Sequence, residues 1–146
     1  MTTRSRLALV AAAVLASIAI RAQAGQHLQV IEHALTDTTI DIGPKGDSVG
    51  DLLTFANPVF DAADKIQVGT DQGYCIRVAV GKSWECFWTL ILKDGQITVE
   101  GPFFDSGDSV MVVTGGSGKY AGAKGSMKLH ARDAKGSAYD FGYELQ

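Results

Sequence analysis

The chain has 146 residues, with 13 Lys and Arg, 16 Asp and Glu, and a hydrophobic fraction of 46%. This length suits one domain of ordinary size. The excess of acidic residues disfavours nucleic acids and anionic membrane surfaces as partners, because both are bound through clustered cations.

The first segment has the features of a secretory signal peptide. Two arginines precede the apolar run LALVAAAVLASIAI, and the small-x-small sequence AQA ends at Ala24. Arg21 ends the run short of the roughly 20 apolar residues that span a bilayer, which disfavours an uncleaved membrane anchor. We predict a cleaved signal peptide at 1–24 and a secreted or periplasmic domain at 25–146. That domain keeps ten Lys and Arg against 16 Asp and Glu, and its charge of about −6 favours a neutral or apolar partner.

The remaining chain shows no helical periodicity. Short apolar stretches alternate with the turn sequences GPKGD, KDGQ, GGSGK and AKGS, and Asp94-Gly95 is typical of a two-residue β-hairpin loop. Eight short, evenly spaced strands predict an all-β antiparallel barrel or sandwich. These strands are expected near 28–34, 49–56, 66–80, 84–93, 96–103, 109–114, 120–132 and 137–145.

The hairpins predict which side chains share a face. With two-residue loops at Asp94-Gly95 and Gly81-Lys82, Arg77 lies opposite Cys86, and Cys86 lies opposite Phe103. The shared face is typical of the lining of an enclosed space, and it carries Gly73, Cys75, Arg77, Trp84, Cys86, Trp88, Leu90, Ile97, Val99, Gly101 and Phe103. The opposite face is also apolar, which favours an oligomer or a covering element; it carries Ile76, Val78, Val80, Phe87 and Ile91.

The glycine-rich stretch VTGGSGKYAGAKG at 113–125 does not fit a phosphate-binding loop. A P-loop needs glycine at the position of Val113 and the aliphatic hydroxyl of serine or threonine at the position of Tyr120. A nucleophile elbow needs glycine in place of Lys119. We therefore predict a tight turn between two strands.

Neither a metal nor a cofactor is expected. His27, His33 and His130 are the only histidines, and none has a partner at metal-ligand spacing. No motif in the chain indicates an organic cofactor.

Two features leave alternatives open. Glu32 interrupts the apolar strand LQVIEHAL, and it either faces water on an edge strand or lies in the lumen as a carboxylate for proton transfer. Cys75 and Cys86 share a face as diagonal neighbours, so they form either a disulfide or two free lumenal thiols.

Four segments, 50–61 (GDLLTFANPVFD), 65–75 (KIQVGTDQGYC), 97–129 and 139–145 (YDFGYEL), resemble the allene oxide cyclase barrel. The second segment and VVTGGSGKYAGAKG are also similar to the related dirigent proteins. The resemblance implies an eight-stranded antiparallel barrel, commonly trimeric, with an apolar central cavity.

The resemblance also implies site residues. The family's first-strand glutamate falls on Glu32 and its cysteine on Cys75, whereas its tyrosine falls on Phe103 and its water-holding asparagine on Ala34. Two polar groups of the family's site are therefore replaced. The fold is expected to transfer more safely than the plant reaction.

We therefore expect a secreted barrel that binds an apolar small molecule in its lumen and templates its cyclisation or isomerisation. Such an enzyme would be a cofactor-independent isomerase, with Glu32 and Cys75 as the catalytic candidates. The expected ligand-binding residues are Arg77, Trp84, Trp88, Val99 and Phe103. The alternatives are a non-catalytic carrier or dirigent-type guide, and a structural protein whose own side chains fill the cavity.

Overall fold

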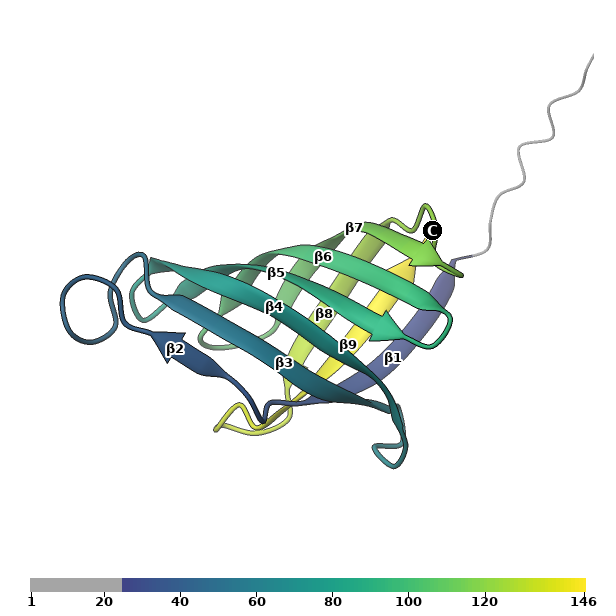
Figure 1. Cartoon of the computed structure of the whole chain (residues 1–146), viewed down its shortest axis with the longest axis horizontal. Coiled ribbons are helices and arrows are strands. Elements are labelled where there is room, and N and C mark those ends of the chain that lie inside the picture. The colour runs from purple at the N-terminus through teal and green to yellow at the C-terminus, as the bar shows by residue number, and fades with distance from the viewer. Residues whose placement is uncertain (1–24) are drawn as a thin grey trace, which may run out of the picture.

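The computed structural model describes residues 25–146, and the predicted signal peptide at 1–24 lies outside them. These residues form nine strands and no helix that could span a membrane (Figure 1). The strands are β1 (Gln26–His33), β2 (Thr38–Ile40), β3 (Leu52–Asp61), β4 (Gln67–Ala79), β5 (Ser83–Leu92), β6 (Gly95–Phe104), β7 (Ser109–Gly118), β8 (Gly125–Ala131) and β9 (Ala138–Leu145).

The strands close into one antiparallel barrel. Each strand from β3 to β9 pairs with the next along the chain, β9 pairs with β1, and β1 pairs with β3 to complete the cylinder. Strand β2 pairs with the first residues of β3, so that it extends the edge that β1 begins (Figure 1). The eight-stranded barrel is confirmed. The short β2 was not predicted, because its three residues carry no apolar alternation.

Three predicted strands had wrong boundaries. The strand expected at 109–114 continues to Gly118. The strand expected at 49–56 runs over Leu52–Asp61, since Pro58 is tolerated in it opposite Thr70. The strand expected at 120–132 begins only at Gly125, because Tyr120 to Ala123 forms a turn closed by a hydrogen bond from the Ala123 N–H to the Tyr120 carbonyl. The glycine-rich stretch is thus the end of β7 and the corner into β8.

The predicted faces are correct, but both hairpin registers were wrong by two residues. The β5–β6 loop is Lys93-Asp94, and Cys86 lies opposite Gly101. The β4–β5 loop has three residues, one more than predicted, which alone would turn the side chains of β4 to the opposite face. A bulge at Val78 adds a second extra residue and returns these side chains to the predicted face. Cys75 therefore lies directly opposite Cys86. A shift of two residues leaves each side chain on its face and changes only its partner.

The core fills the barrel interior from all eight strands. Both tryptophans point inward, with Trp84 7% and Trp88 2% exposed. Trp88 packs between Phe55 and Phe141, at ring-centroid distances of 5.8 Å and 5.5 Å. Gly73 lies opposite Trp88, and a Cβ there would overlap the tryptophan backbone and its Cβ.

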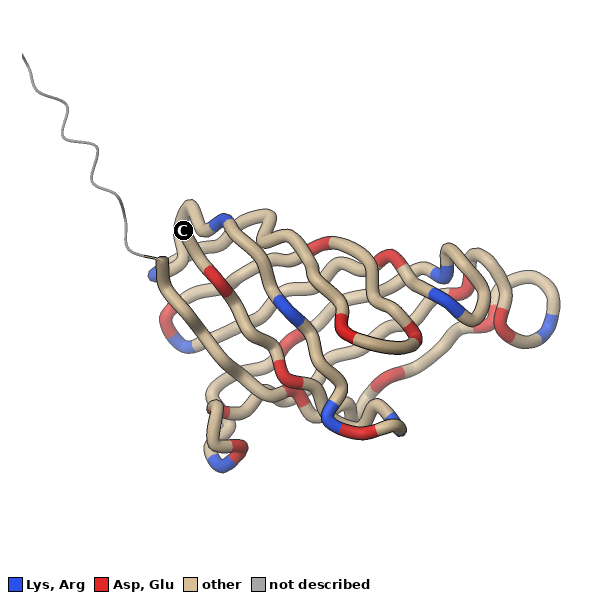
Figure 2. Tube along the Cα trace, turned by 180° about the vertical axis from the view of Figure 1, so that it is seen from behind, with Lys and Arg blue, Asp and Glu red and all other residues tan. Residues whose placement is uncertain are grey.

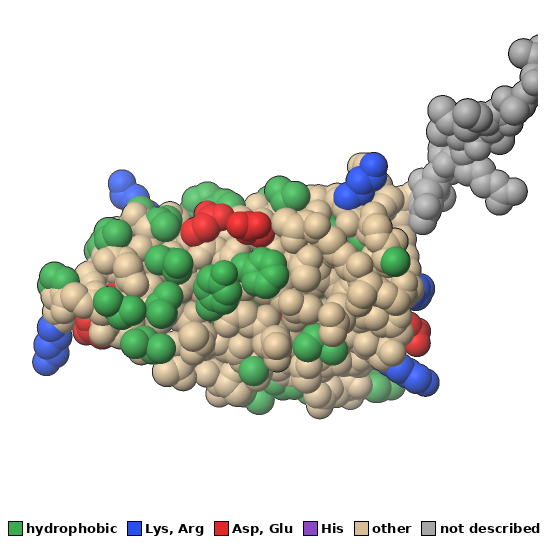
Figure 3. All heavy atoms as spheres, turned by 45° about the horizontal axis from the view of Figure 1, so that its top comes forward, with side chains coloured by type: hydrophobic (Ala, Val, Ile, Leu, Met, Phe, Trp, Pro, Cys, Tyr) green, Lys and Arg blue, Asp and Glu red, His purple; other side chains and the backbone are tan. Residues whose placement is uncertain are grey.

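The outside of the barrel is apolar over β4 and β7. The side chains that share this exposure are Tyr74, Ile76, Val78, Val80, Val110 and Val112. Figure 3 shows apolar side chains gathered on one face of the molecule. Lysines and arginines lie mostly in the loops and turns between strands (Figure 2).

Candidate active site

A group of carboxyls lies inside the barrel where β1, β3 and β4 meet. Glu32 on β1 is 5% exposed, while Asn57 on β3 and Asp71 on β4 are fully buried. Asn57 and Asp71 are direct cross-strand partners. Barrel closure brings Glu32 to them, because β1 pairs with β3 two residues beyond Asn57, at Val59. The alternative in which Glu32 faces water on an edge strand is therefore wrong.

Asn57 organises this group through both ends of its amide. Its Nδ2 donates to Glu32 Oε1 at 2.7 Å and to Asp37 Oδ1 at 2.8 Å. Its Oδ1 accepts from the backbone N–H groups of Leu35 and Thr36, both at 2.9 Å. Asn57 thus holds the 34–37 connection against the barrel and sets the position of two carboxylates.

Burial changes the protonation of the two inner carboxyls. Desolvation raises the pKa of Glu32 to about 7, against the opposing effect of the Asn57 hydrogen bond. Desolvation and the neighbouring Glu32 charge raise the pKa of Asp71 to about 9. The two carboxyls are close enough to influence each other, so that a charge on Glu32 disfavours a charge on Asp71. At neutral pH the pair therefore holds at least one proton.

A tyrosine on β9 supplies a hydroxyl to the same space. The Tyr139 ring meets Phe103 edge to face at a centroid distance of 6.0 Å. Burial, followed by the Glu32 and Asp37 charges, raises the pKa of Tyr139 to about 12, so this hydroxyl is a proton donor at neutral pH.

Deeper in the barrel, Tyr143 and Trp88 extend the polar group. Burial and the Asp71 charge raise the pKa of Tyr143, and the Trp88 indole N–H opposes that shift. The Tyr143 hydroxyl, the Trp88 indole nitrogen and both oxygens of Asp71 have no protein hydrogen-bond partner in good geometry. Buried polar atoms of this kind are uncommon in native proteins and mark sites of function or bound water.

A cavity opens beside Glu32. Its volume is about 40 Å³, which is enough for a few waters but below the size of a typical ligand pocket. Three of its walls, Leu53, Phe55 and Phe103, are only half-buried. The complete lining is Glu32, Asp37, Leu53, Phe55, Cys75, Trp88, Phe103, Leu129, Tyr139 and Phe141.

Only some of the predicted site residues meet at this cavity. Glu32, Cys75, Trp88 and Phe103 line it. Val99 is fully buried in the core outside the lining. Arg77 and Trp84 form the next inward-facing pair along β4 and β5 and also lie outside the lining.

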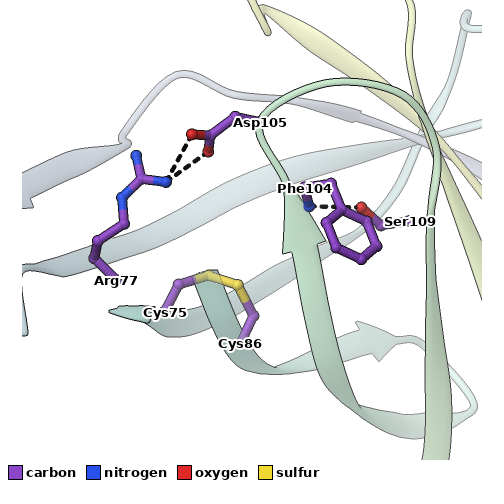
Figure 4. Close-up of a disulfide and its surroundings, with 6 residues drawn as sticks. All are labelled: Cys75, Arg77, Cys86, Phe104, Asp105 and Ser109. Carbon is purple, nitrogen blue, oxygen red and sulfur yellow. Dashed lines mark hydrogen bonds and ion pairs between the residues drawn. A yellow bond between two sulfur atoms is a disulfide. The ribbon is translucent and has the colours of Figure 1, made fainter. Parts of the chain in front are cut away.

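Cys75 and Cys86 form a disulfide across β4 and β5, with a Cα–Cα distance of 4.0 Å (Figure 4). The bridge leaves no free thiol at Cys75. Cys75 therefore contributes a wall to the cavity, and no nucleophile or acid is available there.

Arg77 closes the barrel beyond the disulfide. Its Nη1 lies 2.7 Å from Asp105 in the β6–β7 loop (Figure 4). Its Nε lies 2.7 Å from Asp47 in the β2–β3 loop. The guanidinium also stacks on Trp84, 4.0 Å from the ring centroid. Arg77 thus ties two loops together over this end of the barrel.

The described histidines each pair with one carboxylate. His27 meets Glu144 at 2.8 Å, His33 meets Asp64 at 2.7 Å and His130 meets Asp108 at 2.6 Å. Within residues 25–146, no three His, Cys, Asp or Glu side chains are arranged to hold a metal ion.

Sequence reasoning missed Asn57, Asp71 and Tyr139, although a signal for Asp71 exists. Asp71 has the parity of Gly73 and Cys75, so extending the predicted inner face by one step would have included it. Asn57 and Tyr139 lie on strands whose pairing could not be derived from a tight hairpin.

The fold and this site define a class: a closed antiparallel barrel with an acid–base group inside its lumen. The family model described as allene oxide cyclase matches residues 28–132. The chain belongs to the allene oxide cyclase family.

Solved structures share the fold. A pyocyanin demethylase is 25% identical with a TM-score of 0.69, over 83% of this chain and 100% of that chain. A pterocarpan synthase dirigent protein is 14% identical with a TM-score of 0.68, over 93% and 94%. The Diels–Alderase AbmU from Streptomyces koyangensis is 16% identical with a TM-score of 0.66, over 87% and 70%.

Proposed function

We propose that this chain is a secreted or periplasmic barrel that binds a small molecule in its lumen and catalyses its isomerisation or cyclisation by proton transfer. The observation that carries the proposal is Glu32. This carboxyl lies at the cavity wall, and burial raises its pKa to about 7, while the pKa of the neighbouring buried Asp71 is raised to about 9. General acid–base catalysis is most efficient when the pKa of the group is close to the working pH.

Each group has a distinct part in this chemistry. Glu32 accepts a proton from the bound molecule or donates one to it, and Asn57 holds the carboxylate in position. Asp71 keeps a proton beside Glu32 in the low-dielectric interior. Tyr139 donates a hydrogen bond to an oxygen or nitrogen of the ligand on which charge develops. The aromatic walls restrict the ligand's conformations and exclude water.

The relatives support a role in small-molecule chemistry. Their names describe a demethylase, a Diels–Alderase and a pterocarpan synthase, which are different reactions on one barrel. Because one fold hosts several chemistries, the choice of reaction for this chain depends on its own lumenal residues.

The test starts with native mass spectrometry of the secreted protein, which reports the mass of a carried ligand, the subunit count and the two-dalton loss of the disulfide. Intact mass also shows whether cleavage leaves Gly25 at the N-terminus. The identified ligand is then incubated with the protein in D₂O. We expect a product of altered structure with solvent deuterium bound to carbon, and we expect Glu32→Gln to abolish its formation.

The second candidate is a carrier or dirigent-type guide without chemistry of its own. The Cys75–Cys86 disulfide favours it, because the bridge removes the thiol of one of the two catalytic candidates. A ligand released unchanged and free of deuterium, with equal affinity for wild type and Glu32→Gln, would establish this candidate and exclude proton-transfer catalysis.

We also propose that the barrel forms a homo-oligomer through its apolar outer face, a trimer by the family resemblance. Ile76, Val78 and Val112 are 40%, 50% and 62% exposed on the outside of the barrel. An apolar face of this kind is typical of a subunit interface. Val78→Asp is expected to shift native mass spectra to the monomer, and an unchanged subunit count would exclude this face.

A further inference from the structure

The lumenal site contains acids without a basic partner. The charged residues that line the cavity are Glu32 and Asp37, and Asp71 lies behind them. Every ion pair formed within residues 25–146 involves other acids. Asn57 donates to two of these carboxylates, but its neutral amide does not compensate their charge.

The nearest arginine along the lumen is already satisfied. Arg77 is held by Asp47 and Asp105 and stacks on Trp84, so it does not neutralise the cavity. Burying carboxylates without a cation costs free energy. A positively charged ligand would recover that cost, because its charge would replace the missing partner.

The walls around these acids also suit a cation. Five aromatic rings line the cavity, those of Phe55, Trp88, Phe103, Tyr139 and Phe141. Aromatic faces attract cations, and they do so more strongly where water is excluded. Rings and carboxylates around one cavity match the chemistry of a flat molecule with a delocalised positive charge, and its entry requires the half-buried walls Leu53, Phe55 and Phe103 to move apart.

Unpartnered buried atoms at the same place point to a missing ligand or water. Both oxygens of Asp71 and the Trp88 indole nitrogen lack a partner in good geometry, although both residues are at most 2% exposed. Trp88 lines the cavity. Neither the Asp71 oxygens nor the indole nitrogen takes part in the hydrogen bonds that Asn57 donates to Glu32 and Asp37.

We propose that the ligand of this lumen is a conjugated or aromatic molecule that carries one positive charge, such as a protonated or quaternised nitrogen heteroaromatic. The charge lies against Glu32, with Asp37 at the exposed rim, and the ring system lies among the aromatic walls. This inference rests on the proposed function only for the location of the site, and it replaces the neutral ligand expected from the overall charge.

The test compares probes of matched shape. 1-Methylquinolinium and 1-methylnaphthalene differ in charge but hardly in size, and 1-naphthoate supplies the opposite charge. Binding to the full mature protein is followed by quenching of the two tryptophans and by calorimetry. We expect the cation to bind at least tenfold more tightly than the neutral isostere, and the anion to bind most weakly.

Matched variants assign the charge preference to the lumen. Glu32→Gln should reduce the preference for the cation about tenfold, and Asp37→Asn, at an exposed position, should reduce it severalfold without threatening the fold. Glu100→Gln, an exposed carboxylate on β6, should leave it unchanged. Equal or tighter binding of the neutral or anionic probe, failure of the cation to bind, or an unchanged preference in Glu32→Gln would overturn the inference.

The outcome is separable from that of the proposed function. The probes need not react, so cation selectivity without turnover of any cationic ligand leaves this inference standing and excludes catalysis. Turnover of a neutral native ligand, with no preference for the cationic probe, retains the enzyme and refutes the ligand class.

Discussion

Replacing Asp71 with asparagine tests the protonation of the buried carboxyl pair directly. The pKa of this carboxyl rises from 3.8 to about 9 on folding, mainly because burial disfavours its charged form. The folded state therefore holds a proton that the unfolded state releases. Stability from this group is complete below the unfolded pKa and is lost as the pH rises toward the folded value.

The size of the effect follows from the width of that window. Between pH 5 and pH 8, Asp71 is protonated when folded and ionised when unfolded, so each pH unit lowers the free energy of unfolding by about 1.4 kcal/mol. The asparagine side chain of the D71N variant cannot ionise, and it has nearly the same size and shape as the protonated aspartic acid. The stability of D71N relative to wild type should therefore increase by about 4 kcal/mol from pH 5 to pH 8.

Urea unfolding of both proteins at several pH values measures this difference. Asp94→Asn, in the exposed β5–β6 turn, serves as the matched control and should show no such slope. If the difference between D71N and wild type stays constant with pH, Asp71 is ionised in the folded protein. The inference that the buried pair holds a proton at neutral pH would then be wrong.

Three further predictions concern the scaffold around the site. Reduction of the Cys75–Cys86 bridge, which closes a loop of 11 residues, should lower the free energy of unfolding by about 2–3 kcal/mol in denaturant titrations, and no change would show that the bridge is not formed. Arg77→Met should destabilise the protein by about 2 kcal/mol and speed amide exchange in the two loops that Arg77 ties, and unaltered exchange there would refute the clamp. Gly73→Ala should lower the free energy of unfolding by about 1–3 kcal/mol and shift tryptophan fluorescence, because a Cβ there overlaps the neighbouring strand. Gly115→Ala is the matched control, since its methyl group has room. Similar losses of stability in both variants would contradict the packing around Gly73.

The inner face could be predicted because side-chain alternation is a property of each strand alone. Cys75, Trp84 and Trp88 were placed on one face from hairpin parity, and the structure has them inside. Their partners could not be predicted, since the loop position at Lys93-Asp94 and the bulge at Val78 depend on how the sheet twists and closes.

The sequence by itself determined an all-β chain with an aromatic inner face, because turn residues and two-residue alternation are encoded locally. Only the tertiary structure decided that Glu32, Asn57 and Asp71 meet, since the pairing of β1 with β3 joins segments far apart in the chain. The charge state of the site was decided there too. A carboxyl's pKa depends on the water removed around it and on the charges beside it, and both arise only when the barrel closes.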